Sequence, residues 1–129
     1  MKRRAEAQGE ANIAVIGAGY VGSSIVNQLV RAPAMRPALV VNRTADRAIA
    51  AYELAGFSAT DVVASDDVGT LADAITAGKP AFTESFEAIA ELPIDIAVEA
   101  TGALDYGARA ILSSLDAGQH VVSFNAEID

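Results

Sequence analysis

The sequence predicts an α/β fold built on a doubly wound parallel sheet. Short apolar runs alternate along the chain with segments of helical periodicity. The first apolar run stops at a glycine-rich turn, Gly17 to Gly22, and an amphipathic helical pattern follows that turn directly. Such alternation implies parallel strands joined by right-handed crossovers. We expect a short arm at residues 1–11 and one domain at residues 12–129.

The strand predictions rest on apolar runs that end at glycine or at polar residues. A strand covered by helices on both faces is apolar throughout and does not alternate. The expected spatial order of five such strands is 3-2-1-4-5. The predicted strands are residues 12–16, 39–41, 61–64, 94–100 and 121–124, with 81–83 as a short extended piece.

The helix predictions rest on apolar stripes and on residues that favour helix ends. Thr44 can cap a helix, Gly56 suits the position after one, and Thr70 to Asp73 resembles a capping box. The predicted helices run from Tyr20 to Pro33, from Thr44 to Gly56, from Thr70 to Gly78, across 86–90, and across 108–115 up to Gly118.

Composition narrows the classes of function. The chain of 129 residues has no cysteine and a single histidine, so we expect neither a disulfide framework nor a metal site of cysteines or several histidines. The formal net charge of −8 argues against a nucleic-acid-binding surface, which needs clustered Lys and Arg. An anionic ligand would therefore need a local positive feature, such as a helix N-terminus beside an arginine.

Nothing in the sequence suggests a membrane partner. The apolar runs, such as Leu39 to Val41, are far shorter than a membrane span. The basic start, Met1 to Arg4, leads into Ala-Glu-Ala-Gln-Gly-Glu and not into the apolar region of a signal peptide. We expect a cytoplasmic protein.

The glycine-rich turn is typical of a Rossmann-like loop that binds the pyrophosphate of a dinucleotide. Gly17 would permit the tight turn, Gly19 would let the backbone approach the pyrophosphate, and Gly22 would let the helix pack closely on the sheet. The helix starting near Tyr20 would add free N–H groups and the positive end of its dipole. The predicted cofactor-binding residues here are Gly17, Ala18, Gly19, Tyr20, Val21 and Gly22.

The end of the second predicted strand favours NADP over NAD. NAD-selective domains usually place Asp or Glu there to accept hydrogen bonds from the ribose hydroxyls. This chain has the neutral Asn42, then Arg43, which can contact a phosphate bidentately, and Thr44, which can donate a hydroxyl hydrogen bond. We predict that these three residues bind the 2′-phosphate of NADP. FAD, which also favours an acidic residue here, ranks below NAD.

Polar residues after two further strands are candidates for the other end of the cofactor. Thr101 and Gly102 follow the strand at 94–100 and should border the nicotinamide. Asn125 and Glu127 follow the last strand and are candidates for substrate or catalytic contacts.

Two further polar residues lie in strands. Glu99 either faces the cofactor crevice or is satisfied by loop N–H groups, and we favour the second interpretation. His120 begins a strand at the edge away from the site, so we expect a structural role.

Several segments together resemble a known family. The segments are Ile-Gly-Ala-Gly at 16–19, AITAGKPAFTE at 74–84, IDIAVEATG at 94–102 and GQHVVSFNAEID at 118–129. They are similar to the N-terminal domain of homoserine-dehydrogenase-like oxidoreductases with a C-terminal SAF domain. That group includes 1-deoxy-D-xylulose-5-phosphate reductoisomerase-like enzymes, which use NADPH.

The resemblance implies a nicotinamide cofactor and a second domain, beyond these residues, for a small-molecule substrate. Any homo-oligomer would form through that second domain. Homoserine dehydrogenases proper place a lysine soon after the last strand, where this chain has Asn125 and Glu127. The resemblance therefore leaves the substrate open.

The expected function is NADP(H) binding for an oxidoreductase that transfers a hydride between the nicotinamide and a carbonyl or alcohol substrate. Two alternatives stay open. One is a reductoisomerase-like enzyme, in which a rearrangement precedes the reduction. The other is a nucleotide-sensing module without turnover. We expect the 129-residue chain by itself to bind the cofactor without catalysing the reaction.

Overall fold

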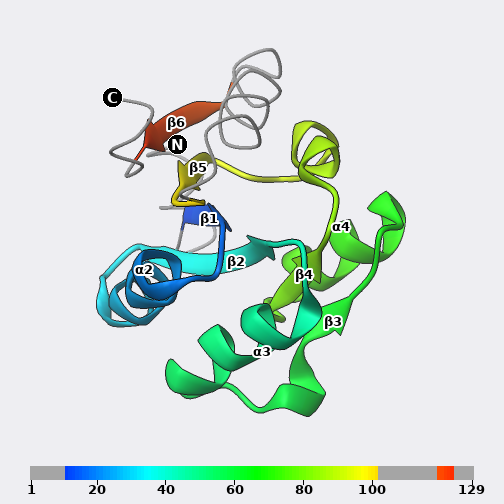
Figure 1. The fold of residues 1–129 in the computed structure, drawn as a ribbon. Coiled ribbons are helices and arrows are strands. Elements are labelled where there is room, and N and C mark those ends of the chain that lie inside the picture. Colours follow the sequence, from blue (N-terminus) through cyan, green and yellow to red (C-terminus); the bar gives the residue numbers. More distant parts are fainter. Residues whose placement is uncertain (1–10, 102–118, 124–129) are drawn as a thin grey trace.

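The computed structural model describes residues 11–101 and 119–123, which form a parallel α/β sheet structure (Figure 1). In this part of the chain six strands pair in the order β3-β4-β2-β1-β5-β6, and every pairing is parallel. The predicted fold class is therefore confirmed. The strands are β1 (Ala11–Ile16), β2 (Met35–Val41), β3 (Val63–Ala64), β4 (Ala81–Thr83), β5 (Ile96–Glu99) and β6 (His120–Ser123).

Helices cover both faces of the sheet. On one face Val15 and Val40 pack with Tyr52 of α3 and Val26 of α2. On the other face the neighbouring residues of the same strands pack against α4 and η2. Because both faces are covered, all six residues of β1 are buried, the polar Asn12 included. The helices are α2 (Tyr20–Arg31), α3 (Ala45–Leu54) and α4 (Val68–Thr76), with 3₁₀-helices η1 (Ala59–Asp61) and η2 (Phe86–Glu91).

The order of the strands corrects one prediction. The strand at residues 61–64 was expected beside β2, but β4 occupies that place, with Leu39 opposite Ala81 and Val41 opposite Thr83. All three residues of β4 are buried, whereas β3 is a two-residue strand at the edge of the sheet. The buried place between β2 and β3 is thus filled by β4, the segment predicted only as a short extended piece.

The start of α4 corrects a second prediction. The helix begins at Val68, and the residue that caps it is Asp67, not Thr70. The Asp67 carboxylate accepts hydrogen bonds from the backbone N–H of Thr70 at 2.9 Å and from its hydroxyl at 2.8 Å. These bonds favour the ionised form and lower the pKa of Asp67. Thr70 is thus the donor of the cap and not its acceptor.

The remaining predicted elements keep their type where the structure describes them. Gly56 follows α3 with a φ of +104°, the left-handed conformation expected of a residue after a helix. Strand β2 begins earlier than predicted, at Met35. The helix predicted across 108–115 lies outside the described residues.

The centre of the sheet positions the site. Ile16, the last residue of β1, lies opposite Val41 on one side and Glu99 on the other. The carboxyl ends of β2, β1 and β5 are therefore level, and the loops that leave them emerge side by side. This edge of an open parallel sheet is where such folds bind ligands.

Candidate functional site

The loop after β1 is packed tightly against the end of β5. Gly17 has a φ of +103°, and a Cβ atom on it would lie 2.8 Å from both the carbonyl oxygen of Ala100 and the Cα of Thr101. Its N–H donates to the carbonyl of Val41 at 2.7 Å. Glycine is therefore required here both by the backbone conformation and by the close approach of a second loop.

The other two glycines of the loop have opposite surroundings. A Cβ atom on Gly22 would overlap the carbonyl group of Gly17, so α2 crosses the turn at a distance that only glycine allows. A Cβ atom on Gly19 would meet no atom within 4 Å. Gly19 is the residue before α2, with a φ of −76°. The fold itself therefore does not require glycine at position 19. What glycine provides there is open space beside the backbone.

The N-terminus of α2 begins directly after Gly19. Tyr20 is 90% exposed and Val21 is 43% exposed, so the first turn is accessible to solvent. The first N–H groups of a helix have no acceptor within it, and they carry the positive end of the helix dipole. No acidic residue in the first turn opposes that charge. The first turn thus has the features of an anion-binding helix end.

Asn42 joins the glycine loop to the loop that follows β2. Its side-chain oxygen accepts a hydrogen bond from the N–H of Ala18 at 3.1 Å. Its side-chain nitrogen donates to the carbonyl oxygen of Thr44 at 3.0 Å. Arg43 and Thr44 are exposed beside it. Thr44 is the residue before α3, as predicted, but its side chain makes no capping hydrogen bond. The predicted 2′-phosphate residues are thus next to the predicted pyrophosphate loop.

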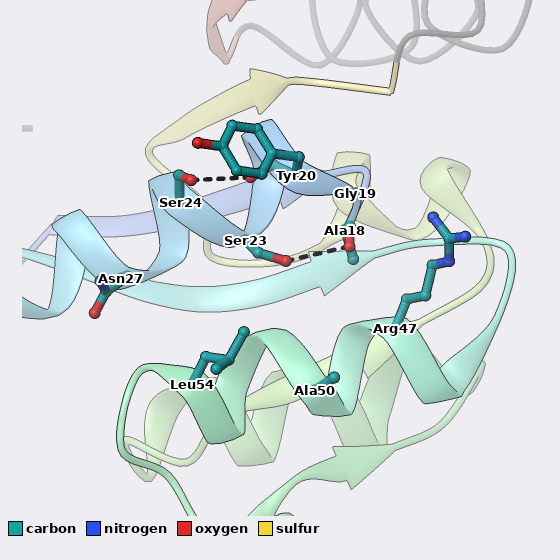
Figure 2. A pocket seen from close by; sticks show the side chains of 9 residues that line it. All are labelled: Ala18, Gly19, Tyr20, Ser23, Ser24, Asn27, Arg47, Ala50 and Leu54. Carbon is teal, nitrogen blue, oxygen red and sulfur yellow. Dashed lines mark hydrogen bonds between the residues drawn. The ribbon is translucent and has the colours of Figure 1, made fainter.

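A hollow of about 490 Å³ lies between the glycine loop and the facing sides of α2 and α3. Figure 2 shows Arg47 rising from the first turn of α3, to the right of Ala18. Among the described residues that line the hollow, Arg47 is the only charged one. The lining residues are Ala18, Gly19, Tyr20, Ser23, Ser24, Asn27, Arg47, Ala50 and Leu54.

Sequence reasoning missed Arg47, although a signal for it was present. Arg47, Ala50 and Leu54 are spaced by three and four residues and therefore share one face of α3. That face is adjacent to the buried one that holds Ala48 and Ala51. Arg47 lies in the first turn of the helix that follows the Arg43 loop, and it lines the hollow beside Gly19.

A buried carboxylate ends β5, directly before the third loop at this edge. Glu99 is completely buried, and its side chain accepts hydrogen bonds from the N–H of Thr101, at 2.8 Å, and from the Thr101 hydroxyl. The interpretation that loop N–H groups satisfy Glu99 is confirmed. Thr101 itself is half-buried, and its Cα lies against Gly17. The Thr101 loop is therefore fixed beside the start of the glycine loop.

Several predicted residues are away from this edge or outside the described part. His120 is exposed at the beginning of β6. In a parallel sheet the beginnings of the strands lie at the end away from the candidate site, as expected for this residue. Gly102, Asn125 and Glu127 lie outside the described residues. Among residues 11–101 and 119–123, no three His, Cys, Asp or Glu side chains gather as a metal site, and no helix has the length and apolarity to cross a membrane.

Comparison with known proteins identifies a family for this chain. A family model described as "Homoserine dehydrogenase, NAD binding domain" matches residues 17–128. The match starts at the first glycine of the loop and includes the ends of β2 and β5. A search of curated proteins found no match.

Proposed function

The chain belongs to the homoserine dehydrogenase NAD-binding domain family, and we propose that it binds NADP(H) for an oxidoreductase. The family assigns a nucleotide-binding domain and a nicotinamide cofactor. We further propose that the cofactor is NADP and that the substrate is a carbonyl compound or an alcohol. When bound, the nicotinamide supplies or accepts a hydride.

The glycine loop is proposed to hold the pyrophosphate. Gly19 leaves space for a phosphate group beside the backbone, and the first N–H groups of α2, which receive no side-chain cap, follow it directly. A fixed loop lowers the cost of ordering the chain when the ligand binds. Gly17 and Gly22 provide this by packing against β5 and against each other.

The observation that carries the choice of NADP is the position of Arg47 in the hollow beside Gly19. Arg43, exposed in the loop after β2, is a second cation at the same end of the sheet. Residues 42–44, where an NAD-selective domain has a carboxylate, contain none. A 2′-phosphate carries negative charge that two guanidinium groups can neutralise with charge-assisted hydrogen bonds.

The nicotinamide end is proposed to lie beside the Thr101 loop. Thr101 follows β5, and its backbone lies against Gly17. A dinucleotide whose pyrophosphate crosses the glycine loop would therefore extend over the ends of β1 and β5. Gly102 is proposed to border the nicotinamide as well, and Asn125 and Glu127 are proposed to contact the substrate.

Calorimetric titration of the 129-residue chain with NADPH and NADH tests this proposal. We expect NADPH to bind at least about tenfold more tightly, because one charge-assisted contact contributes roughly 1.5–3 kcal/mol. Equal affinities would contradict the choice of NADP while leaving dinucleotide binding intact. Failure to bind either cofactor would contradict the proposed function altogether.

A further inference from the structure

The side chain of Asn42 uses both of its polar atoms inside the protein. Its oxygen accepts from the N–H of Ala18, and its nitrogen donates to the carbonyl oxygen of Thr44, with the Thr44 hydroxyl at 3.4 Å. The Asn42 backbone is fixed as well, since its N–H donates to the carbonyl of Thr83 at 3.2 Å. One carboxamide thus connects the glycine loop, the loop after β2 and the start of α3.

These partners require an acceptor and a donor on the same side chain. Ala18 offers an N–H and Thr44 offers a carbonyl, so the two groups of the carboxamide cannot be exchanged. An ionised aspartate has the same shape but only accepts hydrogen bonds. It would keep the bond from Ala18 and would place a negative oxygen against the Thr44 carbonyl.

We infer that Asn42 is a positioning residue for dinucleotide binding and not the residue that contacts the adenosine ribose. It holds the glycine loop against the loop after β2, next to the hollow that Gly19 borders. The inference rests on the proposed function, because it assumes that a dinucleotide occupies this edge. It differs from the usual role of the residue at the end of the second strand, which is to accept hydrogen bonds from the ribose hydroxyls.

The Asn42→Ala substitution should lower the affinity for NADPH and for NADH equally. Both NADPH and NADH bind through the pyrophosphate loop, and the variant must order that loop on binding. The variant loses the hydrogen bonds of Asn42 to Ala18 and to Thr44. We expect this loss to lower the affinity for each cofactor about five- to tenfold. The ratio of the two affinities should not change. In the matched Arg47→Ala variant, only NADPH should bind more weakly.

The Asn42→Asp variant separates positioning from direct contact. If Asn42 faced the ribose, the carboxylate would accept from the ribose hydroxyls and NADH affinity would rise. If Asn42 positions the loops, NADH affinity should stay level or fall, because the bond to Thr44 is lost and nothing is gained at the ribose. A rise in NADH affinity in this variant would overturn the inference.

Hydrogen exchange of the Ala18 amide, measured without cofactor, provides a readout that general destabilisation does not move. We expect protection in the parent, faster exchange in Asn42→Ala, and restored protection in Asn42→Asp, which keeps the acceptor. The β1 amides serve as the internal control for intact folding. Rapid exchange of Ala18 in the parent would contradict the inference without any variant. If the parent binds neither cofactor, the proposed function fails instead.

Discussion

Gly22 lies so close to Gly17 that a Cβ atom on Gly22 would overlap the Gly17 carbonyl oxygen and lie 2.7 Å from its carbonyl carbon. The contact joins the first turn of α2 to the turn that precedes it. Both partners are backbone atoms, so neither can move aside as a flexible side chain can. This contact between backbone atoms therefore fixes the glycine loop without taking part in ligand binding.

The Gly22→Ala substitution should destabilise the fold. In an ordinary helix position this change stabilises by about 1 kcal/mol, because alanine has the higher helix propensity. Here the overlap with Gly17 should outweigh that gain and lower the free energy of unfolding by about 1–3 kcal/mol, as overpacking does. Urea denaturation measures the difference.

Gly69→Ala is the matched control for this test. Gly69 is also helical, in α4, and its added Cβ would meet only the Asp67 carboxylate, at 3.4 Å. We expect this variant to be as stable as the parent or more stable. A stabilising effect of Gly22→Ala would contradict the close approach of Gly22 to the Gly17 carbonyl.

The Gly19→Val substitution should have the opposite effect, leaving the fold intact and abolishing cofactor binding. Gly19 has a φ that valine adopts readily, and its added Cβ would meet nothing within 4 Å. The new side chain would fill the space proposed for the pyrophosphate. Circular dichroism should match the parent while titration with NADPH shows no binding. Normal binding by this variant would contradict the assignment of the loop.

Removing the Arg43 or the Arg47 side chain should reduce NADPH affinity selectively. Loss of one charge-assisted phosphate contact corresponds to roughly 1.5–3 kcal/mol. NADH has no 2′-phosphate, so its affinity should change little in Arg43→Ala and Arg47→Ala. Arg31→Ala, in the last turn of α2, is a control that removes the same charge at the far end of the helix. An equal loss with Arg31→Ala would indicate a general charge effect and not a phosphate site.

The glycine loop and its flanking strand and helix could be predicted from the sequence because their signals are local. An apolar run, a glycine turn and a helical stripe follow one another within residues 12–29, and the structure has β1 and α2 there. The type of the segments after β2 was likewise predictable from their periodicity. Local signals do not, however, specify which strands pair.

The features that were missed depend on contacts between distant residues. Residues 81–83 are too few to show a strand pattern, and only burial between β2 and β3 makes them an inner strand. The bond between Asn42 and Ala18 joins residues 24 positions apart, so its existence could not be read from either segment. Sequence reasoning assigned Asn42 from its position in the chain, whereas its hydrogen bonds favour an indirect role.

Tyr52 provides a test of the core that is independent of the cofactor. It is completely buried, and its hydroxyl donates to the carbonyl of Ala81 at 2.8 Å, linking α3 to β4. Burial disfavours the charged phenolate and raises the pKa of Tyr52. Tyr52→Phe should lower the free energy of unfolding at neutral pH by about 0.5–1.5 kcal/mol, the net value of one hydrogen bond.

The pH dependence of this effect has a definite sign. The folded pKa of Tyr52 lies above its unfolded value of about 10, so the unfolded chain releases the proton first as the pH rises. The stabilisation by the neutral phenol is therefore complete below that pH and is lost above it. Parent stability should fall more steeply above about pH 10 than that of Tyr52→Phe, as followed by denaturation across the alkaline range. Parallel curves would show that the phenol is not desolvated.

The last prediction is that the 129-residue chain binds NADPH without oxidising it in the presence of small carbonyl compounds. Reduction of a carbonyl needs a proton donor within hydrogen-bond reach of the carbonyl oxygen. His120 is at the opposite edge of the sheet and Tyr52 is buried in the core, while Lys79 precedes β4 at that same opposite edge. Absorbance at the NADPH band should stay constant with a panel of aldehydes and ketones, under conditions where titration shows the cofactor bound. Steady oxidation of NADPH would show that a proton donor is already present in this chain, and Tyr20, exposed at the glycine loop, would then be the first residue to replace with phenylalanine.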